Sequence, residues 1–150
     1  MPLAIFIIVV MGIFALAISR TTIQSSTSSS LELVSTQAFY AAESGTQRAM
    51  QTLFFPDASS RQQVDTRCTN LNVTHNFTVP GLNGCSAVVT CTCRFQDNSD
   101  CKPITAANYT AAAATARTTS FYNITSEATC GSGALRAVRT IEAGSFLNQE

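Results

Sequence analysis

This chain of 150 residues has no tryptophan, one histidine and one lysine, and only 12% of its residues are charged. With a single histidine, a pair of imidazoles for acid–base catalysis or for metal binding is excluded. The nine basic side chains are scattered, and none lies next to another in the sequence. The sequence therefore indicates no surface of the kind that binds nucleic acid.

Motifs of common enzyme classes are also missing. The chain has no G-x-S-x-G sequence and no glycine-rich phosphate-binding loop. Ser44 does precede Gly45, but it lies in a helical segment, where a nucleophile finds no backbone N–H donors for an oxyanion. We therefore expect a protein that is not an enzyme and that uses no cofactor and no metal ion.

Charge is absent from residues 1–18, and Arg20 is the only charged residue before Glu32. A helix of this length and composition can cross the hydrocarbon layer of a membrane. A signal peptide would carry basic residues ahead of a shorter apolar core, so we expect this segment to be retained. Its predicted membrane-inserting side chains are Leu3, Ile5, Phe6, Ile8, Val9, Val10, Ile13, Phe14 and Leu16.

The helical pattern continues through residues 19–55 and ends before Pro56. The hydroxyl-rich run Ser25–Ser30 is a weak stretch, which predicts a local break, a joint or a poor helical turn. Small residues recur on one face, where they would let a partner helix approach closely. This helix-packing set is Leu31, Val34, Ala38, Ala42, Gly45, Ala49 and Leu53, and the aromatic residues of the segment, Phe39 and Tyr40 among them, are expected to pack in the core or at interfaces.

After Pro56 the apolar period changes from that of a helix to that of a strand. His75 falls on the apolar side of the first strand and is expected to be a partly buried strand residue. The polar run Gln96–Asp100 is read as a solvated turn rather than a calcium site, because no glutamate completes the ligand set. The predicted strands are 71–79, 87–95, 120–130 and 135–143, and 106–117 is predicted to be a short helix or a packed loop.

All six cysteines follow the helix: Cys68, Cys85, Cys91, Cys93, Cys101 and Cys130. The C-x-C spacing at Cys91 and Cys93 does not match paired zinc knuckles, whereas an even count in a small anchored domain is typical of disulfides. The pairing is left open. Four N-x-[ST] sequons, at Asn72, Asn76, Asn108 and Asn123, indicate glycosylation only weakly, because about two are expected by chance in a chain this rich in Asn, Ser and Thr.

The segment AFYAAESGTQRAM, residues 38–50, resembles the AFxAAEsG signature of minor pilins of the PilX and MshP type, the latter from MSHA-class pili. The helix over residues 1–53 resembles the N-terminal helix of type IV pilin-like proteins, and ITSEATCGSGALRAVRTIEA, residues 124–143, resembles the last strands of the MshP type. The resemblance implies an α+β fold. A long helix over 1–55, apolar over 1–18 and amphipathic over 19–55, would pack on a small antiparallel sheet domain with disulfides over 56–150.

The resemblance also implies a function and a set of partners. The chain would be a structural subunit of an extracellular filament: a minor or tip pilin or pseudopilin, with the major subunit as the less favoured alternative. Its partners would be other pilin subunits, the inner membrane before assembly, a prepilin peptidase and an ATPase-driven assembly platform. Met1 would be the processed and N-methylated residue, although an initiator methionine is the other reading of the same position.

Ile5 departs from the pattern of the major pilins. Most of them carry a glutamate at mature position five, whose carboxylate pairs with the N-terminal amine of a neighbouring subunit. If Met1 is the mature start, Ile5 removes this contact and favours a minor or tip subunit. The alternative from a different class is a membrane-anchored, disulfide-rich domain for ligand binding or adhesion that does not polymerise.

Overall fold

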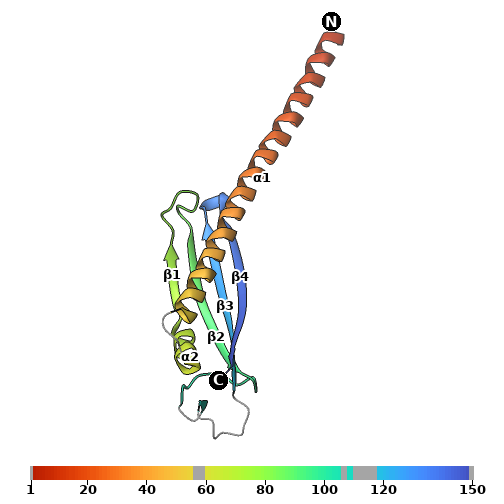
Figure 1. Cartoon of the computed structure of the whole chain (residues 1–150). Helices are drawn as coiled ribbons and strands as arrows, with labels where there is room; N and C mark the ends of the chain where they lie inside the picture. Colours follow the sequence, from red (N-terminus) through yellow and green to blue (C-terminus); the bar gives the residue numbers. More distant parts are fainter. Residues whose placement is uncertain (1, 56–59, 106–107, 110–117, 149–150) are drawn as a thin grey trace.

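The computed structural model describes residues 2–55, 60–105, 108–109 and 118–148, without the side chains of residues 2–4, 21, 23 and 24. One long helix lies against a four-stranded antiparallel sheet, which confirms the expected α+β fold (Figure 1). The elements in chain order are α1 (Pro2–Phe54), α2 (Arg61–Asn70), β1 (Asn72–Asn76), β2 (Ser86–Phe95), β3 (Thr119–Cys130), the 3-10 helix η2 (Gly133–Leu135) and β4 (Ala137–Asn148).

Helix α1 has 53 residues and ends one residue before the predicted end. Its second half crosses one face of the sheet, and its first half projects beyond it (Figure 1). The run Ser25–Ser30 stays helical, so a break there is not seen. Hydroxyls bond back to the preceding turn, from Thr22 Oγ1 to the Ile18 carbonyl at 2.9 Å and from Ser30 Oγ to the Ser26 carbonyl at 3.1 Å.

The strands follow one another as an antiparallel meander in the order β1-β2-β3-β4. Alternate residues of β2 and β3 turn toward α1, as the period-2 pattern requires. Ala87, Val89 and Phe95 on β2 are buried, with Tyr122 and Ile124 on β3. The predicted inner face of β2 is therefore confirmed.

Some strand bounds differ from the prediction. β1 ends at Asn76 rather than at the predicted residue 79, because the chain bends at Val79 and turns over residues 80–84, where Gly81 has a positive φ of 88°. β4 begins at Ala137 rather than at Leu135 because Gly133–Leu135 forms η2. The segment predicted as a short helix or loop, 106–117, lies outside the described residues except for Asn108 and Tyr109.

The small-residue face of α1 packs on the sheet of its own chain. Ala38, Ala42 and Ala49 are at most 2% exposed, and a Cβ at Gly45 would lie 2.6 Å from Ser126 Oγ and 3.0 Å from Val89 Cγ2. The expectation that this face receives a partner helix is thereby corrected. A helix crossing a twisted sheet must come close to it at one point, and small side chains permit that approach.

Helix α2 was not predicted. Arg61, Val64, Asp65 and Cys68 are its buried residues, at the i, i+3, i+4 and i+7 spacing of one helical face. Two of the four are charged, so the segment does not show the apolar periodicity by which helices are recognised.

The six cysteines form three disulfides, as expected, and the structure decides their pairing. Cys68–Cys91 joins α2 to β2, Cys85–Cys130 joins the start of β2 to the end of β3, and Cys93–Cys101 joins β2 to the turn that follows it. Cys85–Cys130 therefore cross-links one end of the β2–β3 pair, and Cys93–Cys101 lies near its other end.

The contact at Gly45 predicts a specific pattern of stabilities. In Gly45→Ala, overpacking should lower the free energy of unfolding by about 1–3 kcal/mol. The higher helix propensity of alanine should offset about 0.5–1 kcal/mol of this loss. Ser126 Oγ is buried without a hydrogen-bond partner among the described residues. Ser126→Ala should therefore be neutral or stabilising, and should rescue part of the loss in the double variant.

Denaturant unfolding of the unmodified chain, Gly45→Ala, Ser126→Ala and the double variant measures this coupling in a double-mutant cycle. Gly144→Ala is the matched control, because no atom lies within 4 Å of a Cβ at Gly144. Additive effects of Gly45→Ala and Ser126→Ala would contradict the contact.

Loop length predicts the order of disulfide contributions. Chain entropy gives about 4 kcal/mol for the Cys85–Cys130 loop and about 2.5 kcal/mol for the Cys93–Cys101 loop, whose separations are 45 and 8 residues. All four sulfurs belong to buried residues, so double replacement by alanine leaves comparable cavities. Thermal unfolding should show the larger loss for the Cys85/Cys130 pair, and the reverse order would contradict the entropic account.

Candidate functional site: the exposed half of the long helix

The apolar half of α1 is bare in the isolated chain. Ile5, Phe6, Ile8, Val9, Ile13, Phe14 and Leu16 are the predicted membrane-facing residues that lie exposed, together with Ile7, Met11 and Ile18. Exposure runs from 47% at Ile7 to 71% at Ile8. Val10 is half-buried, the Leu3 side chain lies outside the description, and Met1 lies outside the described residues.

This half is long and apolar enough to cross a membrane, and its most apolar window has no buried residue. A core helix of a soluble domain would be covered by its own chain, whereas this one is not. Apolar surface of this extent is unfavourable in water, so it needs lipid or other protein around it. By its length and composition this half is a candidate membrane anchor, and its exposed side chains are equally available to another protein.

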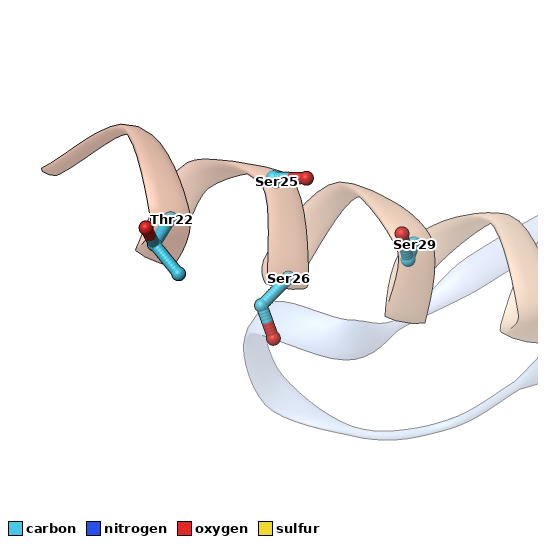
Figure 2. Close-up of a pocket in the computed structure, with 4 residues that line it drawn as sticks. All are labelled: Thr22, Ser25, Ser26 and Ser29. Atoms are coloured by element: carbon cyan, nitrogen blue, oxygen red, sulfur yellow. The ribbon is translucent and has the colours of Figure 1, made fainter. Parts of the chain in front are cut away.

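A band of hydroxyls separates the bare half from the packed half. Thr22, Ser25, Ser26 and Ser29 line a shallow surface on α1, and they follow one another along the helix without a side chain from another element (Figure 2). The Ile18 carbonyl already accepts the Thr22 hydroxyl, so the band is partly satisfied within the helix. It has the composition of a boundary between apolar and aqueous surroundings rather than of an enclosed pocket.

The packed half of α1 has its own exposed apolar side chains. The predicted packing set, from Leu31 to Leu53, is buried or half-buried against the sheet. Leu33, Phe39 and Tyr40 are exposed instead, at 63%, 47% and 54%, with the two rings edge to face at 5.8 Å between centroids. These three, rather than the small residues, are available to another molecule.

A second group of interest is buried beneath α2. The carboxylate of Asp65 is fully buried and accepts hydrogen bonds from the hydroxyls of Tyr122 at 2.6 Å, Tyr109 at 2.7 Å and Ser120 at 3.0 Å. Ser120 Oγ in turn accepts from the Arg61 guanidinium at 3.0 Å. We call these five residues the Asp65 cluster.

Arg61 completes the cluster from the other side. Its guanidinium donates to the Asn108 carbonyl at 2.8 Å and lies over the ring of Tyr109, 4.7 Å from the centroid. The cluster therefore fastens α2 to β3 and to residues 108–109. Sequence reasoning missed it, and the only available signal was the helical spacing of Arg61 and Asp65.

The other residues considered as candidate sites from the sequence have structural contacts in the fold. Asp97 Oδ1 accepts from the Ser99 backbone N–H at 3.1 Å and caps the predicted turn, while Arg94 lies beside Asp100, which disfavours a cation there. Asp65 lies near Cys93 and Cys101, but a disulfide joins these sulfurs, so they cannot ligate a metal. His75 is half-buried on β1 as expected, and burial followed by the charge of Arg48 lowers its pKa.

No family model, curated protein or solved structure matches this chain. Its function is therefore argued from its residues and its geometry.

The Asp65 cluster predicts an alkaline loss of stability. Burial, and then the hydrogen bond and charge of Asp65, raise the pKa of both Tyr109 and Tyr122 above the ordinary tyrosine value. The folded chain keeps both phenols protonated where the unfolded chain ionises, so the free energy of unfolding should fall as pH rises above about 10. Urea unfolding between pH 8 and 11 measures this slope.

Substitution of Tyr122 should change both the free energy of unfolding at pH 7 and its decline at alkaline pH. Tyr122→Phe removes one donor to buried Asp65 and should cost about 1–3 kcal/mol at pH 7. It should also flatten the alkaline decline, since one phenol with a raised pKa is gone. Tyr40→Phe, at an exposed phenol of α1, is the control and should stay within about 0.5 kcal/mol at pH 7. An unchanged slope in Tyr122→Phe would contradict the assignment.

Proposed function

We propose that this chain is a structural subunit of a type IV pilus-like extracellular filament, as a minor or tip pilin or pseudopilin. The observation that carries the proposal is the bare apolar half of α1, which continues directly into a half packed on a disulfide-linked sheet. A subunit that is stored in a membrane and later buried among other helices needs this arrangement. The resemblance of residues 38–50 to the minor pilin signature supports the same reading.

The energetics favour two successive environments for the apolar half. Each large apolar side chain contributes about 1.5–3 kcal/mol when it is removed from water. Ten such side chains, from Ile5 to Ile18, are exposed in the isolated chain, taking those named above. Extraction from the inner membrane is thus favourable only if the helices are reburied at once, and the core of a filament provides such a place.

The second half of α1 supports packing with other subunits outside the membrane. Leu33, Phe39 and Tyr40 extend the exposed apolar surface along α1 past the hydroxyl band and beside the sheet domain. A neighbouring apolar helix laid along this surface would cover it. In this arrangement α1 contacts its own sheet on one side and other subunits on the other.

The sheet domain has the properties of an outer shell. Three disulfides and the Asp65 cluster tie its elements together, and such cross-links suit a protein that works in an oxidising compartment without chaperones. Ile5 in place of a glutamate favours a minor or tip position over the major subunit, because the charge pair with a neighbouring amine is then missing. The prepilin peptidase and the assembly platform follow from the resemblance as further partners.

Immunogold electron microscopy of filaments sheared from the native cells tests the proposal, with antibody against residues 60–148. We expect label on filaments, at their ends or at rare positions for a minor or tip subunit. Label along the whole length would assign the major subunit instead. Unlabelled filaments, with the chain confined to the membrane fraction, would refute the proposal and favour the anchored domain that does not polymerise.

Two matched charge variants separate assembly from membrane insertion. Leu33→Glu places a carboxylate on the exposed face of α1 outside the apolar half, and should leave the chain in the membrane but remove it from filaments. Thr90→Glu adds the same charge on the far face of the sheet, opposite the uncharged Asn72 and Thr125, and should leave both locations unchanged. Equal incorporation of the two variants would contradict packing through Leu33.

A further inference from the structure

The face of the sheet that points away from α1 carries an exposed aromatic pair. The strand register aligns Arg94, Phe121 and Phe146 in one row across β2, β3 and β4. Phe121 is 47% exposed and Phe146 is 60% exposed, with ring centroids 6.3 Å apart and planes tilted by 40°. Neither ring belongs to the core, and in the isolated chain the two exposed rings pack against each other.

Polar groups border the rings in the next row, where Thr92, Asn123 and Gly144 are aligned. Thr92, Arg94, Phe121 and Asn123, with Tyr122 between them, line a shallow hollow of about 250 Å³. Gly144 has no atom within 4 Å of the place a Cβ would take. Phe146 is the ring neighbour of Phe121 on β4 and is not among the residues that line the hollow. Among the described residues none hydrogen-bonds the side-chain amide of Asn123.

The charge in this hollow is balanced. The Arg94 guanidinium donates to the Asn98 carbonyl at 3.0 Å and lies 3.8 Å from an Asp100 carboxylate oxygen. A ligand therefore meets N–H donors there without a net positive charge. This arrangement complements a neutral polar molecule better than an anion.

The apolar patch is too small for a protein partner. Beyond the two rows named above, the same face carries Thr90, Thr125 and Glu142, and then Val88, Glu127 and Thr140. A stable protein interface needs about 800 Å² on each side with an apolar centre, whereas this threonine- and glutamate-bearing face adds to the two rings only the separate valines Val88 and Val138. The patch fits a ligand of about the size of one ring.

We propose that this hollow, which we call the Phe121 platform, binds the pyranose ring of a neutral glycan. One face of a pyranose presents C–H groups that pack on an aromatic ring, and its edge presents hydroxyls. Phe121 supplies the ring at the hollow, and Phe146 extends the aromatic surface beside it. Asn123, Arg94 and Thr92, whose hydroxyl donates to the Asn123 carbonyl at 3.4 Å, supply polar groups at the edge. The proposal is independent of filament assembly, because the platform lies on the face opposite α1.

Saturation-transfer NMR on the full chain tests this, in a detergent without a sugar headgroup. The probes are the methyl glycosides of glucose, galactose, mannose and N-acetylglucosamine, with galacturonate as the anionic comparison. We expect transfer to the ring C–H protons of at least one neutral glycoside. Phe121→Ala and Phe146→Ala should each weaken its binding about tenfold, corresponding to the loss of one stacking contact.

Val88→Ala is the matched control, since Val88 is 43% exposed on the same face away from the platform. It should bind as the unmodified chain does, and circular dichroism of all three variants should match because no core residue is changed. No transfer from any neutral glycoside, transfer from galacturonate alone, or transfer that survives both phenylalanine variants would overturn the proposal. A dimer of the full chain that the phenylalanine variants dissociate would overturn it too, by assigning the face to a second copy.

Discussion

A mismatch of length between α1 and the sheet governs this structure. The helix has 53 residues and is about 80 Å long, whereas the longest strands have 12 residues and span about 40 Å. The sheet can therefore cover only half of the helix, whatever its side chains are. The chain places its small residues on the covered half and its uninterrupted apolar run on the other, so the uncovered half needs lipid or other protein for burial.

Around the covered half, the domain is held by contacts that suit a rigid unit. Gly45 lets α1 approach β2 and β3 closely, and the Asp65 cluster fastens α2 beneath the end of α1. A buried carboxylate is costly unless its oxygens receive donors, and three hydroxyls supply them here. The two faces of the sheet therefore differ in what covers them. Helix α1 covers the inner face, and the outer face, with the proposed Phe121 platform, is exposed.

Sequence patterns predicted the elements whose periodicity is regular. The apolar run and its amphipathic continuation predicted α1 to within one residue of its end, and alternation predicted the inner face of β2. They failed where a buried position is polar, as in α2, since Arg61 and Asp65 are stabilised by partners more than 40 residues away in the chain. They also assigned the small residues of α1 to a partner helix, because a close-approach surface looks the same in sequence whether a helix or a sheet covers it.

The sequence by itself determined that a long helix with a charge-free first third precedes a small domain of strands and disulfides, because hydrophobic period and cysteine number are local properties of the chain. Only the tertiary structure decided which cysteines pair, which face of α1 remains available, and that Arg94, Phe121 and Phe146 share a row. These depend on strand register and on the position at which α1 crosses the sheet. Contacts between residues far apart in sequence determine both, and no local pattern records them.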